Sequence, residues 1–425
     1  MGRLGVIKLA RVILFIKFSA PNVSIRCEKT CPYRNMLFAD RTANSLGEIM
    51  VRFIQTSDWQ IGMKGGGLGE AGPIVRETRI ESIHYVLKAA QEREADFVLL
   101  CGDIFEHNMV SQEEVRKVVA IFNQYSDVPL YLLPGNHDIL GADCVYNREI
   151  FQRVKHLTII RTCEPIQVPG ACLHPCPILS RFITQDVTGS MPVIRETDGI
   201  HIGIAHGSLV GKSPVPNWED IHLPVDPSCV DRTGIDYLAL GHWHSHRTFE
   251  DSTGIVRIAY SGTHEQTRYA EGDAGQCLLV QIDEKGDEPK IETVKTGQLT
   301  WVSDEFEMRD ASSLAELKDY LESIKEIDMV RLALLGELPL ESREELDNML
   351  DFQATVHRNF RVKMELLNII SPTQLDEQID LGDPTLNQTE RELSQLLADE
   401  TDPRERRVIV EAITHLRRFG KDVEA

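Results

Sequence analysis

The sequence predicts a layered α/β sandwich that is followed by a small α+β domain and by C-terminal helices. Three observations support this fold class. Between about residues 50 and 300, short apolar strands alternate with amphipathic helices. These strands end in glycine and polar side chains, which is where open α/β sheets place their sites. Beyond about residue 300 the spacing of apolar residues changes, which indicates a second domain.

The composition is that of an ordinary globular protein, with 42% hydrophobic and 26% charged residues among 425. This length allows two or three domains with separate cores. The net charge of -21 argues against broad adhesion to nucleic acid or to anionic membranes. It does not exclude a nuclease, because bound divalent cations would reverse the local sign at a site built from carboxylates.

The nine cysteines are odd in number and scattered, which is typical of reduced thiols in a cytosolic protein. We therefore expect a cytoplasmic location. Two pairs lie close in sequence, Cys27/Cys31 and Cys172/Cys176, and the second pair brackets His174. Neither pair has a second half at the spacing of a zinc site, so the sequence does not favour a structural metal there.

Residues 1–49 are basic, unlike the rest of the chain, and we expect an extension that is disordered or not part of the fold. Their apolar run, 12–16, is interrupted by Lys17 and is too short to span a bilayer. It also lacks the apolar length and the cleavage site of a signal peptide. No other stretch resembles a transmembrane helix, so we expect no membrane association.

The predicted strands of the first domain, residues 50–300, share one property: each of the five main ones ends in side chains that can bind a metal. These strands and their polar ends are 52–56 with Asp58 and Gln60, 97–101 with Asp103, 128–133 with Asn136, His137 and Asp138, 201–205 with His206, and 237–240 with His242 and His244. Turn residues at a strand end place such side chains on a rim where they can act together.

Helices and loops connect these strands. Apolar residues at helical spacing predict a helix up to about Glu94, and Ser111 with Glu114 forms a capping box that opens another helix. The glycine-rich loop 62–69 lacks the Gly-Lys-Ser/Thr ending of a phosphate-binding loop, so we expect a flexible rim loop. The segments expected to close the domain as antiparallel strands are 255–261, 277–282 and 290–294.

The second domain, residues 301–370, is predicted as strand, helix, strand, helix and strand, without a polar cluster of its own. Residues 371–425 are predicted as a linker, rich in Asp, Gln and Pro over 372–384, and C-terminal helices. Two short amphipathic helices between about residues 389 and 419 meet at Asp402-Pro403. Their apolar stripe either packs on the same chain or binds a partner.

The polar strand ends offer carboxylate oxygens, an amide oxygen and imidazole nitrogens, a mixture that suits Mn, Fe or Zn better than Ca or Mg alone. Singly, each residue has an ordinary alternative: Asp58 could cap a helix, and His206 could be a hydrogen-bonded core histidine. Their joint occurrence in the order D-x-Q, GDxxE, GNHD, AHG and GHWH favours a two-metal centre.

This ordered set resembles the calcineurin-like metallophosphoesterase superfamily over residues 50–300. Within it, the unbroken run 133–138, the run 102–105 and the α+β domain that follows are similar to the SbcD-like nuclease subunit of the bacterial double-strand-break repair exonuclease. The resemblance implies a sandwich of the metallophosphoesterase type, a capping domain at 301–370, and two divalent metal ions, with Mn expected and Fe, Zn or Mg as alternatives.

The resemblance also assigns roles to nine of the strand-end residues. The expected metal ligands are Asp103 for both ions, Asp58, Gln60 and His244 for the first, and Asn136, His206 and His242 for the second. His137 would protonate the leaving group, and Asp138 would hydrogen-bond to His137 and orient it. Such proton transfer contributes about 10²–10⁴-fold to a rate.

Two positions depart from the family. Gln60 stands where the family usually has a histidine, and Glu106 stands where these nucleases commonly have another, with His107 next to it. Glu106 is either an extra acid facing the metals or an ordinary carboxylate at a helix start. Trp59 could stack on a base at the mouth of the site, although a packing role is favoured.

The leading hypothesis is a metal-dependent phosphodiesterase that acts on DNA, as the exonuclease and endonuclease subunit of a double-strand-break repair complex. Its partner would be an SMC-like coiled-coil ATPase of the SbcC type, docked on the C-terminal helices, and a homodimer is also considered. Two alternatives stay open: a phosphodiesterase or phosphatase that acts on small or protein substrates, and a non-catalytic regulatory subunit weakened at Gln60.

Overall fold

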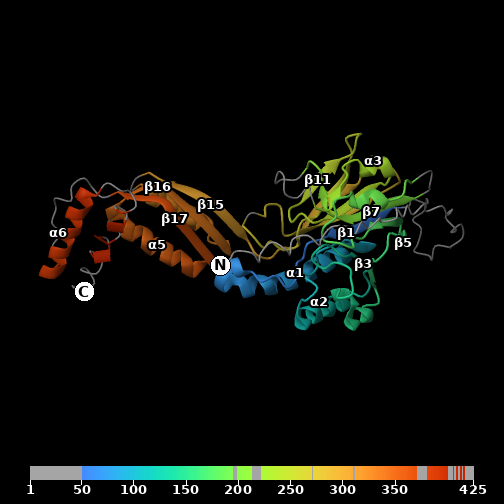
Figure 1. The fold of residues 1–425 in the computed structure, drawn as a ribbon, viewed down its shortest axis with the longest axis horizontal. Helices are drawn as coiled ribbons and strands as arrows, with labels where there is room; N and C mark the ends of the chain where they lie inside the picture. The colour runs from blue at the N-terminus through green and yellow to red at the C-terminus, as the bar shows by residue number, and fades with distance from the viewer. Residues whose placement is uncertain are drawn as a thin grey trace, which may run out of the picture. The chain divides into compact units, whose positions relative to one another are not determined.

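The computed structural model describes residues 50–194, 199–212, 222–269, 271–309, 312–370 and 381–400, with residues 405, 408, 409, 412, 413, 415 and 416. It confirms the predicted α/β sandwich: two six-stranded sheets face each other between residues 51 and 295 (Figure 1). The predictions for residues 1–49 lie outside the described residues.

The first sheet has the strand order β14-β13-β1-β2-β3-β4. Its strands are β1 (Val51–Thr56), β2 (Phe97–Cys101), β3 (Leu130–Leu133), β4 (Leu157–Ile159), β13 (Gln276–Ile282) and β14 (Lys290–Lys295). Strands β1 to β4 are parallel, whereas β13 and β14 continue the sheet antiparallel. The carboxyl ends of β1, β2 and β3 therefore lie at one edge.

Two helices, α1 (Gly72–Glu92) and α2 (Gln112–Gln124), bury their apolar faces against the outer face of this sheet. The predicted capping box opens α2, because the Ser111 hydroxyl accepts from the Glu114 N–H at 3.2 Å and the Glu114 carboxylate accepts from the Ser111 N–H. We expected a flexible rim loop in the glycine-rich segment 62–69, and its second half begins a 3-10 turn, η1 (Gly66–Ala71). Leu68 of this turn is buried beside Met329 of the second domain.

The second sheet has the strand order β11-β12-β10-β7-β6-β5. Its strands are β5 (Ile166–Val168), β6 (Ala171–Cys176), β7 (Ile200–His206), β10 (Tyr237–Gly241), β11 (Arg247–Glu250) and β12 (Val256–Tyr260). Strand β12 pairs parallel with β10, so the antiparallel pairing expected for 255–261 holds only on its other side, where β11 lies.

The apolar core between the two sheets combines side chains of both, such as Phe53, Phe97, Ile202 and Tyr237. The outer face of the second sheet is covered by shorter elements. The remaining elements of this domain are η2 (Val145–Asn147), η3 (Glu149–Arg153), η4 (Val187–Ser190), β8 (Ser208–Leu209), β9 (Pro224–Val225) and α3 (Cys229–Thr233).

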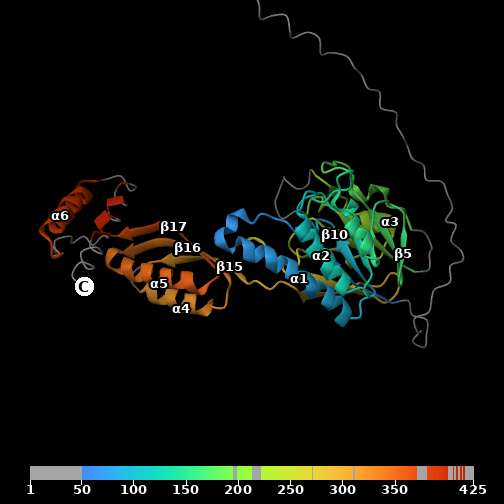
Figure 2. The same cartoon turned by 90° about the horizontal axis from the view of Figure 1, so that it is seen from below.

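The second domain is a parallel three-stranded sheet with α4 and α5 on one face (Figure 2). Its elements are β15 (Trp301–Met308), α4 (Ser313–Ser323), β16 (Met329–Pro339), η5 (Leu340–Ser342), α5 (Arg343–Val356) and β17 (Asn359–Ile370). Leu332, Leu334 and Phe360 face the helices. Since side chains alternate along a strand, Arg331 and Arg361 emerge on the opposite face.

Helix α6 (Pro384–Asp399) begins inside the predicted linker, earlier than expected, because Asp383 caps it by accepting from the Thr385 N–H at 2.7 Å. Leu397 is buried with Leu340 and Ile413, so part of the C-terminal stripe packs on its own chain. The expected junction of the two helices at residues 402–403 lies outside the described residues. Across the described ranges, every helix is too short or too polar to cross a bilayer.

Candidate metal centre

The five polar strand ends meet at one place, at the carboxyl ends of β1, β2 and β3 in one sheet and of β7 and β10 in the other. Backbone hydrogen bonds join the first two ends directly: the Asp58 N–H donates to Gly102 O at 2.9 Å, and the Gln60 N–H donates to Asp103 O at 2.9 Å. The sheets are joined here too, since the His242 N–H donates to the Asp58 carboxylate at 3.0 Å. The predicted residues thus come together from five distant segments.

Four of them form what we call the strand-end cluster: Asp103, Asn136, His206 and His242. One ligand atom each from Asp103, His206 and His242 lies within 4.8 Å of the others. The Asn136 amide oxygen lies 3.0 Å from His206 Nε2 and 3.1 Å from His242 Nδ1. A carboxylate oxygen, an amide oxygen and two imidazole nitrogens therefore face a common point, and this donor set fits a divalent transition metal.

The His206 imidazole is surrounded by acceptors. Its Nδ1 lies 2.8 Å from Cys101 O, while its Nε2 lies 3.3 Å from the Asp103 carboxylate and 3.0 Å from the Asn136 amide oxygen. Burial lowers the pKa of His206, but the charge and hydrogen bond of Asp103, the charge of Asp58 and the hydrogen bond to Cys101 together raise it to about 9. The pKa of His242 is lowered to about 3 by burial and by His206. The negative surroundings that hold a proton on His206 would hold a metal cation in its place, because a bound metal displaces that proton.

Asp103 is 2% exposed, and its carboxylate accepts hydrogen bonds and interacts with the charges of neighbouring histidines. Burial raises the pKa of its carboxyl group, yet the charge and hydrogen bond of His206 and the 2.8 Å hydrogen bond from the His137 N–H outweigh burial, so the net direction is downward. An ionised carboxylate at the centre of the site is the form that a bridging ligand requires.

The other predicted ligands line the opposite side of the centre. Asp58 is fully buried, and burial raises its pKa despite the nearby imidazoles. His244 Nδ1 lies 2.7 Å from the Glu271 carboxylate, which leaves its Nε2 for a cation. Burial raises the pKa of Glu271, but the hydrogen bond and charge of His244 and the hydrogen bonds from Thr267 together lower it to about 2. Gln60 borders the same cavity as Asp103, His242 and His244, so three of the residues expected to hold the first metal, Gln60, Asp103 and His244, face one space.

The role expected for Asp138 is corrected by the structure. Its carboxylate accepts from the backbone N–H groups of Ile104 at 2.9 Å, Phe105 at 3.2 Å and Gly135 at 2.7 Å, and from the hydroxyl of Tyr146. The imidazole of His137 pairs instead with the backbone carbonyl of Glu106, 2.9 Å from Nδ1. Asp138 thus joins the turns after β2 and β3 and does not orient His137.

The two alternatives for Glu106 and Trp59 are also decided by their surroundings. Glu106 does not begin a helix, since α2 starts at Gln112; its carboxylate borders the cavity, 3.9 Å from His137 Nδ1. Trp59 is fully buried, donates to the Thr56 hydroxyl at 2.7 Å and packs against Phe122. Stacking of Trp59 on a base is therefore excluded.

The backbone of the site is strained. Among the described residues, seven that are not glycine have a positive φ, and four of these are predicted site residues: Asp58, Gln60, Asp103 and His242. Such conformations cost about 1–3 kcal/mol each and cluster at functional sites. Gly135 shows how closely two of the turns approach each other, since a Cβ there would lie 2.2 Å from Asp103 Oδ1. Only glycine allows this approach.

Sequence reasoning missed two residues that hold the site. Glu271 follows β12 in a charged loop without a recognisable motif, and its partner His244 lies 27 positions earlier. Arg79 is buried in α1 and donates to the backbone carbonyls of Asp58 at 3.2 Å and Glu265 at 2.6 Å, which ties the first turn to α1. A charged residue on an otherwise buried helix face was the only signal for Arg79.

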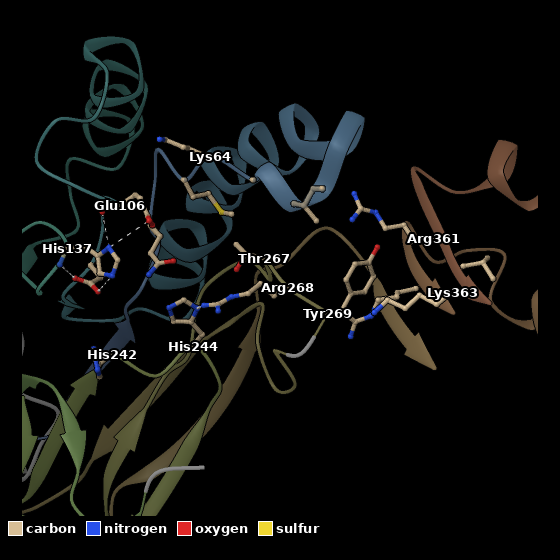
Figure 3. Close-up of a pocket in the computed structure, with 17 residues that line it drawn as sticks. Lys64, Glu106, His137, His242, His244, Thr267, Arg268, Tyr269, Arg361 and Lys363 are labelled. Atoms are coloured by element: carbon tan, nitrogen blue, oxygen red, sulfur yellow. Dashed lines mark hydrogen bonds and ion pairs between the residues drawn. The ribbon is translucent and has the colours of Figure 1, made fainter. Parts of the chain in front are cut away.

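A cavity of about 1210 Å³ joins the metal centre to the second domain. His137, Glu106 and His242 border one side, while Tyr269 and Arg361 border the other (Figure 3). Five cationic side chains line it: Lys64, Arg268, Arg331, Arg361 and Lys363. The loop that carries Tyr269 contacts the second domain here, because the Arg331 guanidinium lies 4.8 Å from the centre of the Tyr269 ring.

Comparison with known proteins finds a family model that matches the part of the chain that carries these residues. Residues 51–246 match the calcineurin-like phosphoesterase family. The uncharacterized metallophosphoesterase YhaO of Bacillus subtilis is 25% identical over 216 residues, which cover 48% of this chain and 50% of YhaO. The DNA double-strand break repair protein Mre11 of Aeropyrum pernix is 23% identical over 285 residues, 62% of this chain and 66% of Mre11.

Among solved structures, TT1561 of Thermus thermophilus is similar to this chain. The match covers 58% of this chain and 99% of TT1561, with 12% sequence identity and a TM-score of 0.38. The chain thus spans half of the length of YhaO and about two thirds of that of Mre11.

Proposed function

We propose that this chain, whose residues 51–246 form a calcineurin-like metallophosphoesterase domain, cleaves phosphodiester bonds of DNA as an SbcD-like nuclease subunit. The domain belongs to a family of dimetal phosphoester hydrolases, and the ligand set above agrees with that chemistry. The proposed metals are two Mn ions, with Fe, Zn or Mg as alternatives. The role that the name of Mre11 gives it, DNA double-strand break repair, supports DNA as the substrate.

The single observation that favours a polymeric substrate is the cavity with its cationic wall. Pockets for small ligands usually measure about 300–1,000 Å³, and this one measures about 1210 Å³. Its far side carries Arg331, Arg361 and Lys363, which lie beyond the metal ligands. In a protein of net charge -21, such a local concentration of cations suits the phosphates that flank a scissile bond.

The roles of the protein groups follow from their positions. A bound metal pair supplies Lewis acidity toward phosphoryl oxygens and lowers the pKa of water. His137 borders the cavity, and because its Nδ1 pairs with Glu106 O, proton exchange with a leaving oxygen falls to Nε2. The Tyr269 ring beside Arg331 offers a face on which a base can stack.

The proposed partner is an SMC-like coiled-coil ATPase that binds the C-terminal helices. Helix α6 divides its apolar residues: Leu397 is 2% exposed, whereas Leu396 is 56% exposed. The exposed side is available to a second protein. Removal of residues 381–425 should abolish co-purification with the ATPase and leave hydrolysis of an aryl phosphodiester unchanged.

The experiment is a Mn-dependent digestion of end-labelled linear and hairpin DNA, beside hydrolysis of an aryl phosphodiester. The double variant Arg361→Ala/Lys363→Ala should weaken DNA binding, lower the salt slope of log K by about 1 for each lost phosphate contact, and spare the aryl substrate. The matched control, Lys88→Ala/Lys117→Ala, removes two cations, one on α1 and one on α2, that pair with Glu92 and Glu77. Aryl phosphodiesterase activity without any DNA cleavage would refute the DNA proposal.

A further inference from the structure

A second group of potential metal ligands lies outside the cavity, in the second sheet. Cys172 and His174 point to the same face of β6, and His201 lies opposite Cys172 in the register of β7. One ligand atom from each lies within 4.8 Å of the others. All three side chains are buried, with exposures of 8% for Cys172, 4% for His174 and 9% for His201. We call these residues the mid-strand cluster.

The mid-strand cluster is not a complete hydrogen-bonded pair. His174 Nε2 lies 2.9 Å from His201 Nδ1, a distance that one shared proton can bridge. The other nitrogen of His174, Nδ1, is buried and has no hydrogen-bond partner. A cation between the rings would make the imidazoles ligands.

We propose that the mid-strand cluster binds a zinc ion, at a site separate from the metal centre. Thiolate and imidazole are the ligands that Zn²⁺ prefers in closed sites. With Zn–N distances of about 2.0–2.1 Å and tetrahedral angles, two ligand nitrogens lie about 3.3 Å apart, so the present 2.9 Å needs only a small opening. The strand geometry thus holds the two imidazole nitrogens near chelating distance and the Cys172 sulfur within 4.8 Å of them.

The surroundings complete the site. The side chain of Gln167, on the edge strand β5, already contacts the Cys172 sulfur at 3.3 Å. Its amide oxygen, or water, would be the fourth ligand, and the exposed Gln167 gives an entry path. The buried Asp236 carboxylate accepts from the His201 N–H at 2.8 Å, which places negative charge beside the cluster. Burial also lowers the pKa of His174 to about 4, so its imidazole is neutral at neutral pH, as a ligand must be.

The test uses the sulfur. Full-length protein is freed of metal with EDTA and titrated with Co²⁺ while absorption is recorded. Because the ligands of the metal centre are oxygen and nitrogen, a thiolate-to-cobalt charge-transfer band can come only from a cysteine. We expect the band to saturate at the intensity of one thiolate per chain, together with the visible d–d absorption of a tetrahedral site, and to be lost when Zn²⁺ is added.

Two variants identify the cysteine. Cys172→Ser should lose the band and weaken zinc binding by more than the 10–100-fold that loss of an outer-sphere partner costs. Cys176→Ser, the matched control on the same strand, should keep both. Zinc should also slow alkylation of Cys172 in the wild-type protein, a readout that needs no variant to fold. A wild-type protein without the band, or a band that survives in Cys172→Ser, would overturn the proposal, and neither result depends on nuclease activity.

Discussion

Strand β7 carries one histidine of each cluster, and the two experience opposite electrostatic environments. His206 at its end lies 3.3 Å from the Asp103 carboxylate, and its pKa is raised to about 9. His201 near its start pairs with another imidazole, and burial lowers its pKa. Two histidines five positions apart are therefore set to opposite charge states by what the neighbouring strands place beside them.

The difference follows from where in a strand each residue lies. Asp103 lies past the end of β2, where a left-handed backbone (φ 55°) is available and its carboxylate can be aimed at His206. Cys172 and His174 lie inside β6, where the pleat fixes their direction and nothing but a neighbouring strand can face them. Strand ends thus form the charged metal centre beside the cavity, which we call the open centre. Strand interiors form the buried mid-strand cluster, which has few charges and which we call the closed cluster.

The largest expected effect is that of Asp103→Ala, which tests whether one carboxylate organises the open centre. Both metals should be lost from the purified protein, because the expected bridging ligand is removed. Activity should fall by more than the 10²–10³-fold that loss of one transition-state hydrogen-bond donor costs. Metal content by mass spectrometry and aryl phosphodiester hydrolysis measure the two results.

The control for this variant is Asp143→Ala, which removes an exposed carboxylate outside the cavity. Its metal content and activity should equal those of the wild type. The zinc of the mid-strand cluster should survive Asp103→Ala, so that one metal per chain remains. Wild-type metal content in Asp103→Ala would show that the site is wrongly assigned.

His137→Ala separates proton transfer from metal binding within the open centre. The side chain borders the cavity, and its imidazole lies 3.9 Å from the Asp103 carboxylate, so both metals should stay bound. The rate should fall by about 10²–10⁴-fold. His84→Ala is the control, since His84 lies on α1 beside Tyr125 and outside the cavity. Loss of metal from His137→Ala would make this histidine a ligand instead.

The next prediction concerns the closed cluster and how the free energy of unfolding of the metal-free protein depends on pH. The folded pKa of His174 is about 4, below the ordinary 6.5, so the unfolded chain takes up this proton first as pH falls. The contribution of His174 to stability is therefore full above pH 6.5 and declines between pH 6.5 and about 4, by up to about 3 kcal/mol. Urea unfolding in EDTA at pH 7 and pH 5 measures this decline.

The variant His174→Gln should show a smaller decline over the same range, while His84→Gln should match the wild type. If His174→Gln and wild type lost the same free energy of unfolding between pH 7 and pH 5, the imidazole would not be the neutral, buried group inferred here. The decline of the wild-type protein is not expected in the presence of zinc, because bound zinc displaces the proton from the imidazole.

The sequence predicted the open centre better than the closed one, for a physical reason. Asp103 and His206 are marked by short motifs at strand ends, and the parallel strands bring such ends to one edge. The pairing of His174 with His201 depends on the register between β6 and β7, which no local pattern encodes. The spacing of Cys172 and Cys176 along the chain did not indicate this cluster, because the partner of Cys172 lies on the neighbouring strand of the sheet.

The second domain shows the same limit. Its strands and helices were predicted in the right order, since each has its own apolar period. No pattern along the chain marks Arg331 and Arg361, because their common cavity forms only when β16 and β17 lie next to the loop that carries Tyr269. The role of Asp138 was predicted wrongly for a different reason. Asp138 is next to His137 in the sequence, but its carboxylate does not contact the His137 ring.

The smallest expected effect is that of Gln60→His, which sharpens the contrast between the two sides of the open centre. Gln60 already has a left-handed backbone (φ 42°) and borders the cavity beside His244, so an imidazole at this position can reach the same space. Replacing a neutral amide with imidazole should tighten the first metal by about 10-fold, or about 1.4 kcal/mol. Titration of the second metal equivalent into EDTA-treated protein measures this. Gln266→His is the control, on a loop outside the cavity. An unchanged affinity in Gln60→His would mean that position 60 contributes no ligand, and that the first metal is held by Asp58, Asp103 and His244 alone.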